Sequence, residues 1–293
     1  MNHNKITIDN WGTSVNELQE QLPERNIDIL TVVYNRPDCV RRLIDSIREH
    51  TKDYMHYIWD NGSREETGNI YDGINQFVIA NDTNAGFIIP NNRLAELGKS
   101  KYICLLNSDV TVQAGWSEKL IEWLENGMDA VGYIGCKYDE NLVGHSGFRY
   151  TDIEYLEGSN LMIRRELYDK LGLFDENLIF AYSEDLEFGC KLRYNQKKQF
   201  AVYPPLIEHI GGASAQEYPC QEDLANWHHY NREYVLKKWG EGRMKTVQER
   251  DLMHVRWSDN GNEAEPKPPH RDVPVNRAQS GLTGKVGGGQ FRV

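Results

Sequence analysis

The sequence predicts an α/β fold in which a mostly parallel central sheet is flanked by helices. Short apolar segments of strand length alternate with segments whose apolar residues recur at helical spacing. The strands of the first half end in clusters of Asp, Asn, Gly and Ser, as at 107–109 behind an apolar strand. Because open α/β sheets bind ligands at the carboxyl ends of their strands, these clusters predict a ligand cleft.

The first half is expected to contain four core strands and the helices that connect them. Pro37 suits the first turn of the helix that follows the first strand. Directly behind the fourth strand, Val110 and Thr111 resume an extended pattern. The expected strands are 27–33, 56–59, 76–80 and 101–106, and the expected helices are about 38–50 and 90–98.

The second half continues the alternation of helices and strands. Ser183 is expected to cap the helix that begins with Glu184. The expected helices are 116–126, 164–171, 184–195 and 224–239, and the expected strands are 130–135, 155–163 and 200–203.

Both ends of the chain are expected to lie outside the core domain, which spans 27–240. Residues 1–26 should form a helical extension, since 14–17 resembles a capping box and Pro23 ends the helix. Residues 241–293 should form a polar, flexible extension, because large apolar residues almost vanish after Ser258. This positively charged tail is either a solvated end or a segment that packs on the acidic domain or on a second subunit, as in a homo-oligomer.

The composition excludes some classes of protein. A net charge of −11 argues against a broad nucleic-acid-binding surface. The first residues lack the pattern of a secretory signal, and no run approaches the ~18 apolar residues of a membrane span. The five cysteines are odd in number and widely spaced, which favours reduced thiols in the core and a cytoplasmic location.

A set of motifs in order along 27–240 resembles the GT-A glycosyltransferases of the family 2 type, in particular the rhamnosyltransferase-like subgroup. The motifs are Val33 to Pro37, Trp59 to Ser63, Asn84 to Gly86, Leu106 to Asp109, Gly158 to Arg164, Tyr182 to Asp185 and His209 to Gly212. The resemblance implies a nucleotide-sugar-binding half at 27–112 and an acceptor and catalytic half at 113–240. It also implies transfer of a sugar from a nucleotide-diphosphate donor to a carbohydrate or another hydroxyl acceptor.

The resemblance assigns the donor nucleotide to residues behind the first three strands. Asp60 can accept a hydrogen bond from the imide N–H of uracil or thymine, which favours UDP or dTDP sugars, although an Asp in this sequence also suits a turn. Tyr34 and Asn35 would line the same base pocket. Asn84 and Gly86 resemble the family's contacts to ribose and diphosphate.

A divalent cation, Mn²⁺ or Mg²⁺, is expected on the diphosphate. Hard cations bind carboxylate oxygens, and Asp109 is the charged residue of its motif, with Asn107 and Ser108 beside it in the donor site. His209 matches the family's second protein ligand. The alternatives are an Asp that stabilises a turn and a histidine that stabilises a loop.

Catalysis is expected at Asp185, with Glu184 as its neighbour or as an acceptor contact. An attacking hydroxyl must lose its proton, and the family has its catalytic base in this motif. A carboxylate that opens a helix is also favoured by the helix dipole alone. Gly158 and Ser159 resemble the segment that faces the acceptor and the donor sugar. A single base implies direct displacement with inversion at the anomeric carbon.

Two other classes of function stay open at this point. The first is a sugar-nucleotide-binding protein that kept the fold and lost catalysis. The second is a nucleotidyltransferase, although residues 34–37 lack the glycine-rich, basic phosphate loop it would need. The acceptor class is equally open among a glycan, a lipid-linked sugar, a protein and a modified nucleobase.

Overall fold

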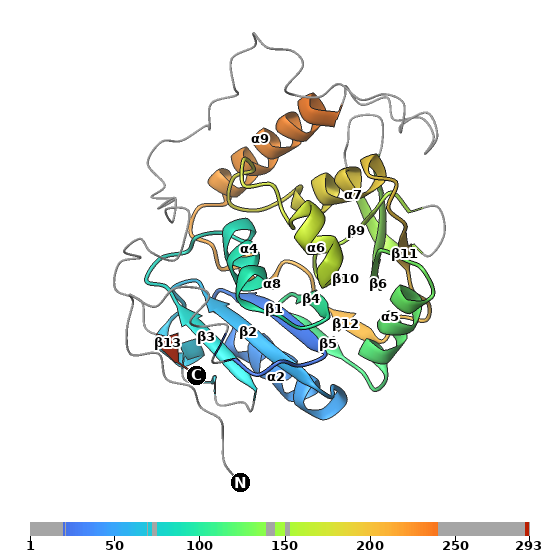
Figure 1. Cartoon of the computed structure of the whole chain (residues 1–293). Coiled ribbons are helices and arrows are strands. Elements are labelled where there is room, and N and C mark those ends of the chain that lie inside the picture. Colours follow the sequence, from blue (N-terminus) through green and yellow to red (C-terminus); the bar gives the residue numbers. More distant parts are fainter. Residues whose placement is uncertain are drawn as a thin grey trace.

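The core of the chain is an eight-stranded sheet in the order β11-β6-β10-β4-β1-β2-β3-β13 (Figure 1). The computed structural model describes residues 20, 22–68, 70–71, 75–138, 144–149, 153–239 and 291–292. Nearly all of the expected extensions at 1–26 and 241–293 lie outside these residues. The strands of this sheet are β1 (Ile27–Val33), β2 (Tyr54–Asp60), β3 (Gln76–Ala80), β4 (Tyr102–Leu106), β6 (Ala130–Gly132), β10 (Asn160–Arg164), β11 (Gln199–Ala201) and β13 (Phe291–Arg292).

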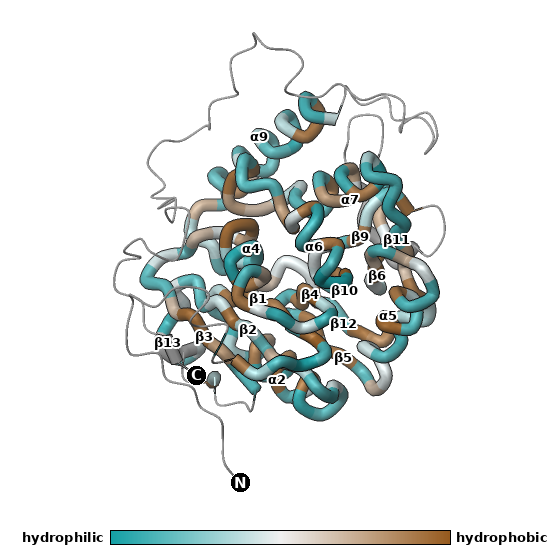
Figure 2. The backbone as a smooth tube through the Cα atoms, in the orientation of Figure 1, coloured by the Kyte–Doolittle hydropathy of each residue, from teal (hydrophilic) through white to brown (hydrophobic). Residues whose placement is uncertain are grey.

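The centre of the sheet is parallel, as the sequence predicts. β1 pairs in parallel with β2 on one side and with β4 on the other, so that Ile27 lies opposite both Tyr54 and Tyr102. β2 pairs in parallel with β3. Every residue of β1, β2 and β4 is buried, because helices cover both faces of the sheet. Figure 2 shows hydrophobic residues concentrated in β1 and β4, whereas α9 is largely hydrophilic.

The helices connect and cover the strands. Pro37 lies in the first turn of the helix that follows β1, as predicted. The boundaries of the other predicted helices agree with the structure within about three residues. The helices are α2 (Pro37–His50), α3 (Glu65–Gly68), α4 (Ile88–Leu97), α5 (Trp116–Glu125), α6 (Arg165–Leu171), α7 (Glu184–Tyr194), α8 (Ala213–Gln216) and α9 (Gln221–Trp239). Among the described residues, no helix combines the length and the apolar character needed to cross a membrane.

The second half departs from the parallel pattern. β10 runs antiparallel to both β4 and β6, with Asn160 opposite Leu106. The segment that enters β10 therefore lies beside the segment that leaves β4, and Asn107 N–H donates to the Ser159 carbonyl at 3.0 Å. This crossing brings two polar motifs, about 50 residues apart in the sequence, to one place.

Two smaller sheets complete the fold. The predicted strands 130–135 and 155–163 are each split in two, because the chain turns between a core strand and a strand of a smaller sheet. One small sheet pairs β5 (Val110–Val112) with β12 (Ile207–His209), and the other contains β7 (Gly135–Tyr138), β8 (Gly144–Arg149) and β9 (Tyr155–Leu156). The sequence analysis did not predict β12, the strand that carries His209. Cys39, Cys104, Cys136 and Cys190 are buried as thiols, in agreement with the expectation for the core.

Candidate active site

A cavity of about 510 Å³ lies where the carboxyl ends of β1 and β4 meet the second half of the chain. Its lining comes from both halves, as expected for a site that holds a donor and an acceptor. The predicted site residues that line it are Tyr34, Asn84, Gly86, Asn107, Ser108, Asp109, Gly158, Ser159, Glu184, Asp185 and His209.

Asp60 and Asn35 differ from the expectation, because neither is among the described residues that line the cavity. Asp60 is only 5% exposed; its Oδ1 accepts a hydrogen bond from Ser63 N–H and its Oδ2 accepts one from the Tyr71 hydroxyl, both at 2.8 Å. Asn35 N–H donates to Ser63 Oγ at 2.8 Å. Both residues stabilise the turn that follows β2 through Ser63, and contact between Asp60 and a base remains a prediction.

Asn61 lines the cavity in their place and holds the next loop. Its side chain accepts from Ala85 N–H at 3.0 Å and donates to the Gly86 carbonyl at 2.7 Å. Gly86 has a φ of 84°, and a Cβ at this position would lie 2.4 Å from the carbonyl oxygen of Phe180. Glycine is therefore required here. The signal for Asn61 was present in the motif at 59–63, but the residue type alone does not show which way its amide points.

Asp109 and His209 come together because β5 and β12 pair, with His209 opposite Val110. His209 Nε2 lies 3.2 Å from Asp109 Oδ1, and Nδ1 on the other side of the ring lies 3.1 Å from Glu157 Oε1. Asp109 Oδ2 also accepts from Ala213 N–H at 3.2 Å. Glu157 was given no role from the sequence, because its contact with His209 joins residues 52 positions apart.

The charges of these groups support one another. Burial opposes charge on His209, yet the carboxylates of Asp109 and Glu157 outweigh it and raise the pKa of the imidazole to about 9. Burial also opposes charge on Asp109, but His209 and the Ala213 N–H hold the pKa of this carboxyl below its ordinary value. The two groups therefore form an ion pair in the absence of other cations.

The same residues fit a divalent cation. Although it lies at ion-pair distance from Asp109, His209 Nε2 is buried and makes no hydrogen bond of acceptable geometry to the described residues. A bound cation would replace the proton on Nε2, and Nδ1–H would still donate a hydrogen bond to Glu157. The Nε2 lone pair beside a carboxylate oxygen would then have the arrangement of a carboxylate–histidine–metal site. Among the described residues no group of three His, Cys, Asp or Glu side chains is placed to hold a metal. Phosphate oxygens and water would have to complete the shell.

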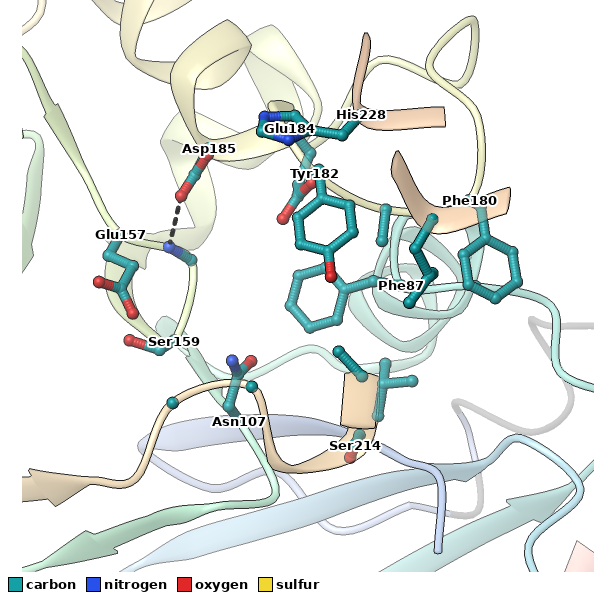
Figure 3. Close-up of a pocket in the computed structure, with 18 of the residues that line it drawn as sticks. Phe87, Asn107, Glu157, Ser159, Phe180, Tyr182, Glu184, Asp185, Ser214 and His228 are labelled. Atoms are coloured by element: carbon teal, nitrogen blue, oxygen red, sulfur yellow. Dashed lines mark hydrogen bonds between the residues drawn. The ribbon is translucent and has the colours of Figure 1, made fainter. Parts of the chain in front are cut away.

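Glu184 and Asp185 enter the cavity from the first turn of α7. Figure 3 shows both side chains pointing from this helix toward the side where Ser159 and Asn107 lie. Asp185 Oδ1 accepts from Leu186 N–H at 2.7 Å, and Oδ2 accepts weakly from Gly158 N–H at 3.4 Å. Glu184 is 8% exposed, and its Oε2 has no hydrogen-bond partner among the described residues.

Burial raises the pKa of both carboxyl groups. For Asp185 the negative charge of Glu157 adds to the effect of burial, and for Glu184 the charge of Asp185 does so. A pair of carboxyl groups with raised pKa in a cleft is characteristic of acid–base catalysis. The prediction that Ser183 caps α7 is wrong. Its φ is 65°, and its side chain makes no capping hydrogen bond.

Aromatic residues form another wall of the cavity, and of these only Tyr34 was assigned to the site from the sequence. The rings of Tyr34 and Tyr218 lie 6.3 Å apart, and those of Phe180 and Tyr218 lie 5.2 Å apart. His228 of α9 lies 5.2 Å from the Tyr182 ring at the top of the view in Figure 3. These contacts join segments far apart in the chain, which no local pattern indicates.

Comparisons with known proteins agree with this architecture. The model of the family described as glycosyl transferase family 2 matches residues 28–174. The O-antigen biosynthesis protein RfbC of Myxococcus xanthus is 24% identical over 204 residues, which are 57% of this chain and 16% of that protein. The glucosyl-dolichyl phosphate glucuronosyltransferase of Haloferax volcanii is 23% identical over 180 residues, 52% of this chain and 56% of that protein.

Solved structures show the same fold. GalNAc-T7 with UDP, GalNAc and Mn²⁺ has a TM-score of 0.61 at 17% identity, covering 75% of this chain and 49% of that one. The mannosyltransferase PcManGT from Pyrobaculum calidifontis, in complex with GDP-Man and Mn²⁺, has a TM-score of 0.53 at 12% identity, covering 72% and 63%. The chain thus spans less than two thirds of the length of each of these four proteins.

Proposed function

This chain belongs to glycosyl transferase family 2 and has the GT-A fold, and on that premise we propose that it is a metal-dependent, inverting glycosyltransferase. It would move a sugar from a nucleotide-diphosphate donor to an acceptor hydroxyl. One observation carries the proposal: a single cavity holds the Asp109–His209 pair on one wall and the carboxyl pair Glu184–Asp185 on another. Such a cavity offers a site for a cation on the leaving group and a base for the attacking group.

Asp109 and His209 would hold the divalent cation, Mn²⁺ or Mg²⁺. Bound there, the cation neutralises negative charge on the departing diphosphate. Support comes from the chemistry of the two ligands and from Glu157, which orients the imidazole. Both similar structures also contain Mn²⁺ together with a nucleotide or nucleotide sugar.

The donor nucleotide would lie across Tyr34, Asn84 and Gly86, with Asn107 and Ser108 toward the diphosphate. A pyrimidine base is favoured in this proposal because the Asp60 carboxylate can accept from an imide N–H. Each carboxylate oxygen of Asp60 already accepts one hydrogen bond, but each has a second lone pair. Asn61, the next residue in the chain, lines the cavity. A base bound beside Asn61 would reach the Asp60 carboxylate.

Asp185 is the proposed general base, with Glu184 beside it. The raised pKa of Asp185 brings its basicity closer to what proton abstraction near neutral pH requires. Gly158 N–H contacts one Asp185 oxygen only weakly, so that oxygen is available to an acceptor hydroxyl. Direct attack by this hydroxyl on the anomeric carbon would invert the configuration, and Gly158 and Ser159 would line the path of the acceptor.

A panel of nucleotide sugars incubated with Mn²⁺ or Mg²⁺, scored for released nucleoside diphosphate, tests the proposal. UDP or dTDP sugars should release UDP or dTDP, and chelator or Asp109→Ala should stop the release. Binding of UDP and Mn²⁺ without any turnover over the whole panel would favour a catalytically inactive sugar-nucleotide-binding protein. Full turnover in excess chelator would contradict the metal requirement, and retained anomeric configuration in the product would contradict direct displacement.

A further inference from the structure

Asn231 belongs to α9, and its side chain is fully buried. All of its hydrogen bonds go to the backbone of one loop, residues 179–182. Its Oδ1 accepts from Ile179 N–H at 2.7 Å. Its Nδ2 lies 2.8 to 2.9 Å from three carbonyl oxygens, those of Ile179, Ala181 and Tyr182. An amide offers an acceptor and two donors in one plane, a set that no aliphatic, hydroxyl or carboxylate side chain of the same size supplies.

The loop that Asn231 holds has an unfavourable backbone conformation. Phe180, Tyr182 and Ser183 have φ values of 60°, 75° and 65°, and none of them is glycine. Bulky L-residues adopt this left-handed region only when their surroundings hold them there, and such residues gather at functional sites. Ser183 makes no capping hydrogen bond at the start of α7, so its side chain does not hold the loop in this shape.

The same loop joins the two walls of the cavity. On the donor side, the Phe180 carbonyl accepts from Phe87 N–H at 2.6 Å and from Ile88 N–H at 3.2 Å. On the other side, the loop runs directly into Glu184 and Asp185. A shift of the loop would therefore move the carboxyl pair relative to the donor, because α7 begins where the loop ends.

We propose that Asn231 is a positioning residue, which fixes the strained loop 179–183 so that Glu184 and Asp185 face the donor. The assignment rests on the proposed glycosyl transfer for its kinetic consequence but not for its structural one. Asn231 touches no reacting atom and acts through the backbone. A displacement of the reacting groups by about 1 Å can lower a rate by about two orders of magnitude.

The test compares Asn231→Leu with a matched control in full-length protein. Leu has nearly the shape of Asn and forms no hydrogen bond. The control is Asn92→Leu on α4, because Asn92 is also buried and its amide also binds backbone groups. The amide accepts from Phe174 N–H and donates to the Phe174 carbonyl, both at 2.9 Å. Asn231→Ser, which supplies one hydroxyl in place of the amide, serves if Asn231→Leu does not fold.

Two readouts separate positioning from general stability. The first is amide hydrogen exchange of residues 179–185, which needs no substrate. The second is kcat for UDP release from a UDP sugar, expressed per UDP·Mn²⁺ binding site counted by calorimetry. Asn231→Leu should speed exchange in 179–185 by about tenfold or more and lower kcat per site by about 10- to 100-fold, with the donor KM changed less than about threefold. Asn92→Leu should leave both quantities near wild type, and Asn231→Ser should fall between.

The proposal would be overturned if residues 179–185 exchanged their amide hydrogens as slowly in Asn231→Leu as in the wild type. It would also be overturned if kcat per site of Asn231→Leu were no lower than that of Asn92→Leu. If wild-type protein turns over no nucleotide sugar, the proposed function fails, and the exchange measurement still decides whether Asn231 fixes the loop.

Discussion

Glu157 Oε1 lies 3.1 Å from Nδ1 of His209, on the side of the imidazole opposite to Asp109. Glu157 belongs to the turn between β9 and β10, whereas His209 ends β12, so the contact ties the second half of the sheet to the small sheet. A carboxylate that accepts the Nδ1 proton fixes both the tautomer and the orientation of the ring. The proposed metal ligand is thus oriented by a residue that itself need not contact the metal.

Glu157→Gln should weaken Mn²⁺ binding in the presence of UDP by about 10- to 100-fold, the usual effect of removing such a partner. The amide is a poorer acceptor and no longer favours the proton on Nδ1. Calorimetric titration of Mn²⁺ measures the change. Glu208→Gln is the control, because it removes the same charge from the exposed neighbour of His209. Equal Mn²⁺ affinities for Glu157→Gln and wild type would contradict the role of Glu157.

Asp185→Asn should lower kcat by about 10²-fold or more, because the amide keeps the size of the side chain and loses its basicity. The affinity for UDP·Mn²⁺ should change little. Glu184→Gln is the matched variant, since it removes the neighbouring charge at the start of the same helix. A larger kcat loss in Glu184→Gln than in Asp185→Asn would exchange the roles of the two residues.

The pH dependence of kcat follows from the raised pKa of Asp185. Burial and the charge of Glu157 hold this pKa above the ordinary value of 3.8. A general base works only when deprotonated, so activity should be present above its pKa and lost as the pH falls through it. The midpoint of the acidic limb should therefore lie clearly above 3.8 in a kcat–pH profile of transfer. A rate that stays constant down to about pH 4 would contradict Asp185 as the base.

The sequence predicted those features that local patterns determine. Strand 27–33 and the start of α2 at Pro37 follow from runs and periodicities within a few residues, and both agree with the structure. The Asp109–His209 pair was expected only through the resemblance to a family. What brings the two residues together is the pairing of β5 with β12, a contact between segments about 100 residues apart.

The parts that local patterns missed are those set by distant contacts. Ser183 has the residue type of a helix cap, but the clamp of Asn231 on the preceding loop turns its backbone into the left-handed region. Asp60 has the type of a base-reading carboxylate, but Tyr71 and Ser63 N–H occupy one lone pair on each of its oxygens. Residue type predicts what a side chain can do, and tertiary contacts decide what it faces.

Asp60→Ala should weaken UDP binding by about tenfold or more if its carboxylate accepts the imide N–H of the base. Tyr71→Phe is the informative control, because it removes the hydroxyl that occupies Asp60 Oδ2 and leaves the carboxylate in place. Its UDP affinity should equal or exceed that of wild type. Fluorescence or calorimetric titration with UDP and with GDP measures both effects. If Asp60→Ala binds UDP as wild type does, Asp60 only braces the turn.

A second buried network lies at the opposite, amino end of the central strands. Asp28 in β1 is fully buried; its Oδ1 accepts from Ser100 Oγ at 2.5 Å, and its Oδ2 accepts from Ser100 N–H at 2.9 Å and from Arg165 at 2.7 Å. Burial raises the pKa of Asp28 despite these partners. The network joins β1, the segment before β4 and the start of α6.

Asp28→Ala should lower the free energy of unfolding by about 3 kcal/mol, because it leaves Nη2 of the mostly buried Arg165 and the Ser100 N–H without their carboxylate acceptor. Asp28→Asn keeps an acceptor oxygen and should cost less. Chemical denaturation measures both, and Asp53→Asn is the control. It keeps a residue type that tolerates the φ of 51° at this position and removes an exposed ion pair with Arg25 at 3.7 Å, so it should cost less than about 1 kcal/mol. Since Asp28 lies at the strand ends away from the cavity, kcat per UDP-binding site should stay at the wild-type value. A cost for Asp28→Ala no larger than that for Asp53→Asn would mean that burial of the carboxylate cancels what its hydrogen bonds contribute.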